Sequence, residues 1–436
     1  MASAKLPDDP RGIDFEEYVA AVCQAAGLYT ELNLIERETV ELLQLDVLTT
    51  DYSVTPPFLR IIEAKSGKNW GSTDLFKIRG AMHHLGVTAG AFAVREERDG
   101  LEIYKDLAEE MDIIFVHAPE CEKEHIAELV SVEDVHDADI WAWRFSYRLQ
   151  RKMLDDLRRW RKLAAGVKGS EAVLRYAFEI TSGIFFTATV ADRVSRLYDA
   201  YSENRDLAAR CAAEIEIGDF IEGAKEISPE IFRRTFYKHE YNPVQVATMI
   251  EHQSRLALLK AAVDYQMCIE GGIIDRAYKT WRIIHGQNVH EIPAIFFPTR
   301  FEDALQEIMK EPYFRRYPLL WQNFLGIFGG FILLDYEEEE YKLLSKRSGI
   351  PVDAIPQAFA VYDKLFPVDG GWFIQPKLSN IRLLKLYPSP MRGIGANFKR
   401  VMYADPQEFE QLKLSGLYTR SDLIAWNNVA ARVLTT

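Results

Sequence analysis

Hydrophobic residues recur at two different spacings in the first part of the chain, and the spacing changes from one segment to the next. Phe15, Val19 and Val22 repeat as on one face of a helix, which is predicted to run over Ile13–Ala26 and to end at Gly27. The elements predicted after it are strands at residues 29–37, 41–50 and 58–64, a helix at 74–85, and strands at 91–94 and 111–117. This succession predicts an α/β domain.

Two of the predicted strands carry charged side chains among apolar ones. Asp46 lies between Leu45 and Val47, and the next strand ends with Glu63 and Lys65. Because side chains two residues apart share a face of a strand, Glu63 and Lys65 point together. An unpaired charge in a buried strand is costly. A divalent cation held by Asp46 and Glu63, with Lys65 beside it, would supply the missing partner.

Two other interpretations of these charges remain open. Asp46 could cap a turn while Glu63 and Lys65 form a surface ion pair on an edge strand, where such a pair contributes little. Against this, Ile61 and Ile62 are expected on opposite faces, as in a strand covered on both sides. In the third interpretation the fold is kept and the catalytic activity is lost, which the presence of all three charged residues disfavours.

The order of elements, with Asp in one strand and Glu-x-Lys at the end of the next, resembles the PD-(D/E)XK nuclease superfamily and its Mrr-like branch in particular. The resemblance covers residues 12–118. The Pro that usually precedes the Asp is absent, since Leu45 stands there. The resemblance implies a restriction-endonuclease-like α/β domain, in which a mixed central sheet is flanked by helices. It also implies hydrolysis of phosphodiester bonds, in DNA first and RNA as the alternative.

The resemblance further implies how the site residues divide the chemistry. Asp46 and Glu63 would bind Mg²⁺, for which Mn²⁺ could substitute, because Mg²⁺ favours carboxylates and retains several waters. Lys65 would orient or help deprotonate the attacking water and offset the developing negative charge.

By the same resemblance, an acid of the first helix would complete the site. Glu16 and its neighbour Glu17 compete for this position, and since their side chains point about 100° apart, only one of them can face the sheet. Glu16 is favoured because it lies at the edge of the apolar stripe and follows Phe15 as in the family pattern.

Several basic and aromatic residues are candidates for binding nucleic acid. They are Lys68 and Trp70 in the loop after the third strand, Lys77 and Arg79 on the second helix, and Arg148, Arg151 and Lys152 in a later stretch rich in aromatics. One alternative is an ordinary loop that ends in a helix N-cap at Thr73 or Asp74. The other is an amphipathic helix whose arginines pair with acids elsewhere, such as Glu214 or Glu216.

Composition narrows the class of protein. The chain has 436 residues, which predicts two or three domains, and 48% of them are hydrophobic, which allows large cores. A net charge of −13 argues against a sequence-blind protein that coats nucleic acid, but not against an enzyme with a local basic groove. The four cysteines lie far apart without a Cys-x-x-Cys pair, so free thiols in a reducing cytoplasm are expected and no zinc site.

Membrane and nucleotide signals are weak. Residues 1–11 contain no apolar signal core, and glycines and two amides interrupt the apolar run 317–334, which therefore predicts a buried helix or helix pair. No GxxxxGK[ST] loop is present, so any ATP dependence would come from a partner chain. The expected partners are DNA and, for assembly, a second copy or another subunit.

The pattern divides the chain into four parts. These are a nuclease-like domain at 1–120, an acidic linker at 121–139, a mainly helical region at 140–336 and a small α+β unit at 337–436. In the last part, residues 341–362 resemble a helix-turn-helix, and strands expected at 372–374 and 382–386 would make the unit winged-helix-like. Pro351 and Pro356 are unfavourable inside a recognition helix, so a helical packing element is favoured.

The expectation from the sequence is a cytoplasmic, Mg²⁺-dependent deoxyribonuclease whose helical region selects the target, regulates the nuclease or mediates assembly. The fusion resembles bacterial restriction and anti-phage defence proteins, which is an association by architecture. The alternative is a non-catalytic nucleic-acid-binding or scaffold protein that retains the nuclease fold.

Overall fold

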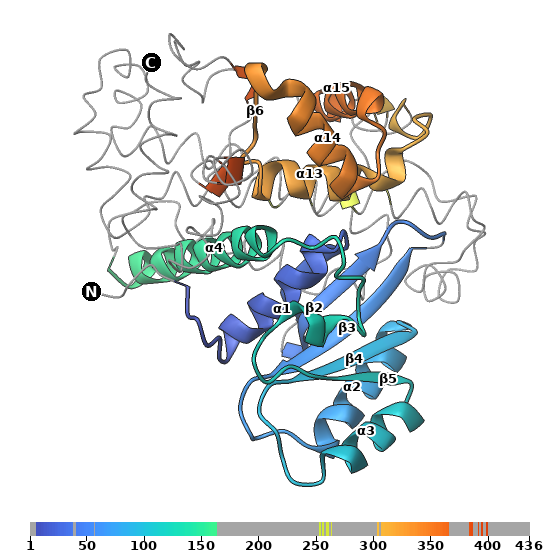
Figure 1. Cartoon of the computed structure of the whole chain (residues 1–436), viewed down its shortest axis with the longest axis vertical. Helices are drawn as coiled ribbons and strands as arrows, with labels where there is room; N and C mark the ends of the chain where they lie inside the picture. Colours follow the sequence, from blue (N-terminus) through green and yellow to red (C-terminus); the bar gives the residue numbers. More distant parts are fainter. Residues whose placement is uncertain are drawn as a thin grey trace.

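The computed structural model describes residues 6–37, 41–55, 57–163, 307–365 and 383–386, with single positions between 253 and 304 and between 391 and 399. Its N-terminal part is an α/β domain in which helices flank a mixed five-stranded sheet (Figure 1). The elements are α1 (Ile13–Ala25), β1 (Tyr29–Arg37), β2 (Glu41–Asp51), β3 (Phe58–Lys65), α2 (Ser72–Leu85), β4 (Ala89–Val94), α3 (Leu101–Glu110) and β5 (Ile113–His117). The predicted order is confirmed, apart from α3.

The strands lie in the order β1-β2-β3-β4-β5. The first three pair antiparallel, and β3, β4 and β5 pair parallel. Short connections join the antiparallel strands, whereas α2 and α3 carry the chain back between the parallel ones, as a parallel crossover requires. The central strand, β3, is therefore hydrogen-bonded on both sides, and its C-terminal end carries Glu63 and Lys65.

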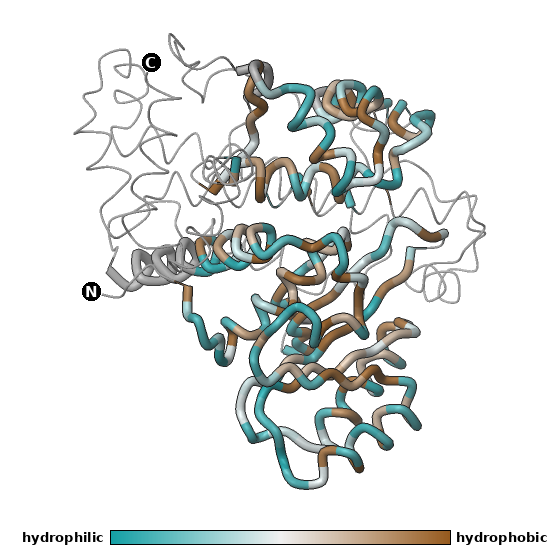
Figure 2. The backbone as a smooth tube through the Cα atoms, in the orientation of Figure 1, coloured by the Kyte–Doolittle hydropathy of each residue, from teal (hydrophilic) through white to brown (hydrophobic). Residues whose placement is uncertain are grey.

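Helices cover both faces of β3, as its two isoleucines predicted. Ile62 packs in one cluster with Phe15 of α1, and Ile61 packs in a second cluster with Ile78 of α2. All four side chains are buried. The hydrophobic stretches of the strands run through the middle of the domain (Figure 2). The interpretation of the charged pair as lying on an exposed edge strand is therefore wrong, because β3 is neither an edge nor exposed.

Helix α3 was not predicted, although Leu101, Tyr104, Leu107 and Ala108 repeat at helical spacing and pack against the second cluster. Among its residues only Ala108 is buried, and Ile103 is 71% exposed. A helix of ten residues depends on this packing more than on its own helical propensity. It nevertheless supplies the connection that keeps β4 and β5 parallel.

The acidic segment after β5 packs against the domain rather than forming a solvated linker. Three apolar residues of this segment, Ile126, Leu129 and Val135, are buried. The Leu129 carbonyl also accepts a hydrogen bond of 2.6 Å from Arg60 of β3. Helix α4 (Asp137–Leu163) follows and lies along α1 (Figure 1). The predicted linker and the start of the predicted helical region thus share a core with the N-terminal domain.

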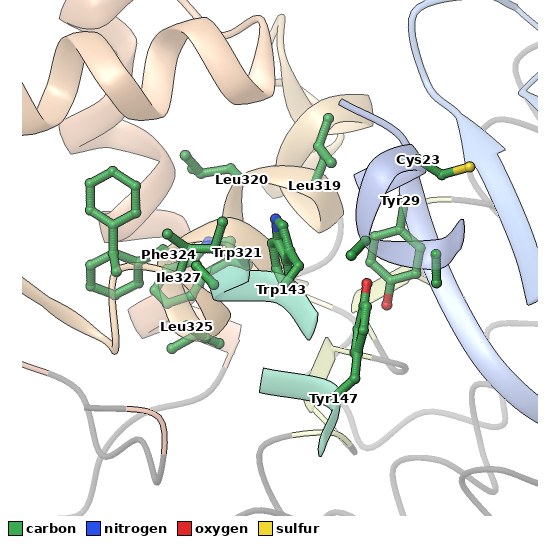
Figure 3. Packing of buried hydrophobic residues seen from close by; sticks show 14 of the residues in the cluster. Cys23, Tyr29, Trp143, Tyr147, Leu319, Leu320, Trp321, Phe324, Leu325 and Ile327 are labelled. Atoms are coloured by element: carbon green, nitrogen blue, oxygen red, sulfur yellow. The ribbon is translucent and has the colours of Figure 1, made fainter. Parts of the chain in front are cut away.

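The described part of the later region joins the same core. It comprises α13 (Tyr317–Gly326), β6 (Phe331–Leu333), α14 (Glu337–Ser348), α15 (Ile355–Leu365) and β7 (Leu383–Leu386). Trp143 of α4 and Trp321 of α13 belong to one buried cluster (Figure 3). A Cβ added at Gly326 would lie 2.6 Å from the Trp143 ring, so the helices meet closely there. The core crosses the boundary predicted between residues 336 and 337.

The apolar run at residues 317–334 begins with a buried helix, α13, as predicted. No helix among the described residues combines the length and the apolar character that crossing a bilayer demands.

The predicted helix–turn–helix succession is present as α14, Gly349 and α15, with Pro356 in the first turn of α15. Phe359 and Tyr362 of α15 pack on Trp321, which fits a packing element. The strand β7 pairs with β6, and the strand predicted at 372–374 lies outside the described residues.

Candidate active site

The site forms where β2 and β3 separate. Their backbone pairing runs from Asp51↔Phe58 to Val47↔Ile62 and ends there. The next free N–H, that of Ala64, donates instead to the carboxylate of Asp46 at 3.0 Å. Asp46 thus replaces a backbone acceptor, which satisfies a buried N–H group and fixes the carboxylate beside the end of β3.

Asp46, Glu63 and Lys65 converge at this point. The Lys65 ammonium lies 2.6 Å from the Glu63 carboxylate and 3.7 Å from the Asp46 carboxylate. Asp46 is 7% exposed and Glu63 is 2% exposed, whereas the Lys65 side chain is partly open to solvent. Two buried carboxylates therefore share one lysine at the mouth of the site.

Burial raises the pKa of Asp46, and the charge of Glu63 raises it further, while the Ala64 N–H and Lys65 oppose the shift. Burial alone would lower the pKa of Lys65, but its hydrogen bond to Glu63 and the charge of Asp46 raise it above its ordinary value. Lys65 is therefore an ammonium at neutral pH, suited to orient a water and to offset negative charge.

Glu16 of α1 belongs to the same electrostatic cluster. Burial raises the pKa of Glu16 to about 7, and Asp46 and Glu63 add to the shift while Lys65 opposes it. The start of α1 is held near the site because the Gly12 N–H donates to the Ser66 hydroxyl at 2.5 Å, directly after Lys65. Glu16 can thus exchange a proton near neutral pH.

Glu17 faces α4 instead. Its carboxylate accepts a hydrogen bond of 3.2 Å from the Arg151 guanidinium and forms an ion pair with the Nε of Arg151 at 3.1 Å, and Arg151 also donates to Asp14 at 2.6 Å. Burial raises the pKa of Glu17 to about 8, with Arg151 as the strongest opposing influence. The two neighbouring glutamates therefore have different surroundings: Glu16 is coupled to the charged cluster and Glu17 joins two helices.

The candidate nucleic-acid residues have different environments. Lys68, Lys77 and Arg79 are exposed, and Arg79 lies 3.6 Å from Asp112. Arg151 and Arg148 both pair with Asp14, at 2.6 Å and 3.8 Å. Their described partner is therefore an acid of α1 and not one of the two glutamates that the sequence suggested. The side chain of Lys152 lies outside the described part of the chain.

Trp70 does not fit its candidate assignment, because its indole is 2% exposed and cannot stack on a base. The ring packs between Phe92, Tyr104 and Phe115, and its N–H donates to the Glu96 carbonyl at 3.0 Å. The following helix begins at Ser72 with Gly71 as its N-cap. Asp74, one of the two predicted caps, instead accepts the Gly71 N–H at 2.9 Å.

Lys77 contacts the site in a way that the sequence did not indicate. Its ammonium lies 2.9 Å from the Glu63 carboxylate oxygen that Lys65 also contacts. The available signal was indirect: Lys77 lies between the buried Leu75 and Ile78 on α2, and α2 covers the face of β3 to which Glu63 points.

The donor set suits a hard divalent cation. Asp46 and Glu63 supply carboxylate oxygens, which fits Mg²⁺ because that ion completes its shell with waters. Within the described ranges no three His, Cys, Asp or Glu residues gather closely enough to hold a metal by themselves. An ion bound by Asp46 and Glu63 would accordingly depend on waters and substrate for its other ligands.

No protein-family model, curated protein or solved structure matches this chain.

Proposed function

We propose that this protein is a metal-dependent nuclease that hydrolyses phosphodiester bonds of DNA, with an N-terminal domain of the restriction-endonuclease-like type. The observation that supports this proposal is the convergence of Asp46, Glu63 and Lys65 where β2 and β3 separate. The mixed sheet with helices on both faces agrees with the fold that the sequence resemblance implies.

In the proposed mechanism, Asp46 and Glu63 hold the cation, with the Ala64 carbonyl as a further oxygen. Bound Mg²⁺ lowers the pKa of water and neutralises charge on a phosphate. Lys65, an ammonium between the two carboxylates, orients the attacking water and stabilises the charge that develops on the phosphate. Glu16, with its pKa raised to about 7, accepts or relays a proton near neutral pH.

The charges of the cluster agree with this mechanism. Asp46, Glu63 and Glu16 oppose the ammoniums of Lys65 and Lys77, so the ionised cluster carries one net negative charge. A divalent cation reverses that sign. The resulting positive charge would favour the binding of a phosphodiester.

The direct test is incubation of the purified protein with supercoiled plasmid and Mg²⁺ or Mn²⁺, with EDTA as the metal-free control and an RNA substrate alongside. Nicked or linear products that need metal, and that are lost in both Asp46→Ala and Lys65→Ala, are expected. Cutting that survives both substitutions would assign the activity to another site or a contaminant. Metal binding without cutting would favour a binding or scaffold protein, or a nuclease gated by a partner.

Glu16 and Glu17 form a matched pair for assigning the third acid. Glu16→Gln is expected to reduce cutting about a hundredfold and to remove the rise in rate with pH near 7, because the group that must lose its proton is gone. Glu17→Gln is expected to leave the cutting rate and its pH profile nearly unchanged. Cleavage rates measured from pH 6 to pH 8.5 distinguish the two glutamates. A larger loss of cleavage rate in Glu17→Gln than in Glu16→Gln would assign the third acid to Glu17.

A further inference from the structure

One carboxylate oxygen of Glu63 is shared by two ammonium groups. Lys65, two residues along β3, lies 2.6 Å from it, and Lys77 of α2 lies 2.9 Å from it. The two lysines differ in exposure: the Lys77 side chain is 45% exposed, compared with 31% for Lys65 and 3% for Glu63. Lys77 is thus the more open of the two cations on a buried anion.

The backbone of Lys77 is held in place while its side chain can turn. Leu75 and Ile78 anchor α2 in the core, and Asp74 closes the first turn of the helix. A lysine side chain has a flexible four-carbon stem and a single compact charge, so it can change partner without moving the helix. Its partly exposed position allows the ammonium to turn outward from Glu63.

We propose that Lys77 is a positioning residue that exchanges between two partners, Glu63 when the metal is absent and a phosphate of the DNA when the metal is bound. This inference rests on the proposed nuclease function. A cation held by Asp46 and Glu63 satisfies the negative charge that now retains Lys77, and two positive centres on one carboxylate oxygen repel each other. The displaced ammonium then lies on the open side of the site, where a phosphodiester approaches.

The exchange predicts effects of opposite sign on the two ligands. Lys77→Met removes a competitor for Glu63, so the affinity for Mn²⁺ is expected to rise about threefold or more. The same change removes a phosphate contact, so DNA binding is expected to weaken about tenfold and its dependence on salt to fall by about one unit of slope. If Lys77 merely supported the fold, its removal would weaken the binding of both Mn²⁺ and DNA.

The test uses the full chain and two measurements without cleavage. Mn²⁺ binding is followed by electron paramagnetic resonance without DNA, and DNA binding by fluorescence anisotropy in a Lys65→Ala background with Mg²⁺ at several salt concentrations. Lys105→Met is the matched control, since it removes a lysine from an exposed ion pair with Glu102 on α3.

Tighter Mn²⁺ binding together with weaker, less salt-dependent DNA binding supports the exchange, provided Lys105→Met changes neither. Weaker binding of both Mn²⁺ and DNA, or no change in the binding of either, overturns the proposed exchange. Failure of the proposed function gives a different result: wild-type protein would then show no Mn²⁺ binding that depends on Asp46, whatever Lys77→Met does.

Discussion

Lys65→Ala is expected to lower the rate of DNA cleavage by at least about a hundredfold without weakening the binding of Mn²⁺. The ammonium of Lys65 contacts both carboxylates, so it offsets charge at the point where a scissile phosphate would lie. It is a cation and cannot itself be a metal ligand. Its loss should therefore slow the chemical step without weakening metal binding.

Asp46→Asn is expected to abolish both DNA cleavage and the binding of Mn²⁺. The amide oxygen still accepts the Ala64 N–H, so the β2–β3 junction is retained, but one of the two anionic ligands is lost. Mutating a residue that only hydrogen-bonds to a metal ligand typically lowers metal affinity about 10- to 100-fold. Replacing a direct ligand should lower the affinity at least as much.

Single-turnover cleavage rates and Mn²⁺ titrations at pH 8 measure this difference, with Lys105→Ala as the control for removing a lysine from an ion pair. If Lys65→Ala lost Mn²⁺ binding as completely as Asp46→Asn, Lys65 would serve mainly to hold the two carboxylates together. The assignment of Lys65 to the chemical step would then be wrong.

Arg151→Met is expected to destabilise the protein by about 2 kcal/mol in alkaline buffer and by clearly less near pH 6. Arg151 joins α4 to α1 through one hydrogen bond to the buried Glu17, one to Asp14 and a further ion-pair contact with Glu17. Without it, an ionised Glu17 would lose the cation that opposes its raised pKa most strongly.

The pH dependence follows from the direction of the Glu17 shift. Burial raises its pKa from 4.5 to about 8, so in this pH range the folded state holds the proton that the unfolded state has lost. A group of this kind favours folding most at low pH and loses that contribution as pH rises to its folded pKa. Removing Arg151 raises the folded pKa further, so wild type and variant differ little near pH 6 and most above pH 8.

Urea unfolding followed by circular dichroism at pH 6 and pH 9 measures the difference. Arg148→Met is the matched control, because Arg148 forms a longer ion pair with Asp14, at 3.8 Å, and opposes the raised pKa of Glu17 less than Arg151 does, so a smaller effect is expected. When Glu17 is already replaced by Gln, Arg151→Met should cost the same stability at pH 6 and pH 9. An equal loss of stability at both pH values with Glu17 present would mean that Glu17 is not the group that responds.

Local pattern was sufficient to predict the framework of the N-terminal domain. Helical spacing identified the buried stripe of α1, and Ile61 and Ile62 indicated that β3 is covered on both faces. Alternation along β3 also predicted that Glu63 and Lys65 share a face, and their contact agrees with this. These properties depend on residues a few positions apart, so the sequence displays them directly.

Contacts between distant segments were not predictable in the same way. The loop containing Trp70 has the composition of an exposed loop, yet the indole is enclosed by Phe92, Tyr104 and Phe115 from three other elements. Arg151 pairs with an acid 134 residues away, and nothing in its own helix indicates which acid that is. The predicted pairing with Glu214 or Glu216 involved residues that lie outside the described part.

The sequence by itself determined the order of the elements apart from α3, the buried faces of α1 and β3, and the charged residues at the end of β3, because helical and strand periodicity are local. Only the tertiary structure decided that Glu16 rather than Glu17 is coupled to that cluster, that Lys77 reaches Glu63 from α2, and that α4 and α13–α15 share the core. Those outcomes depend on which helix face meets which partner. That choice is made by the packing of apolar surfaces far apart in the chain, which the sequence does not pair in advance.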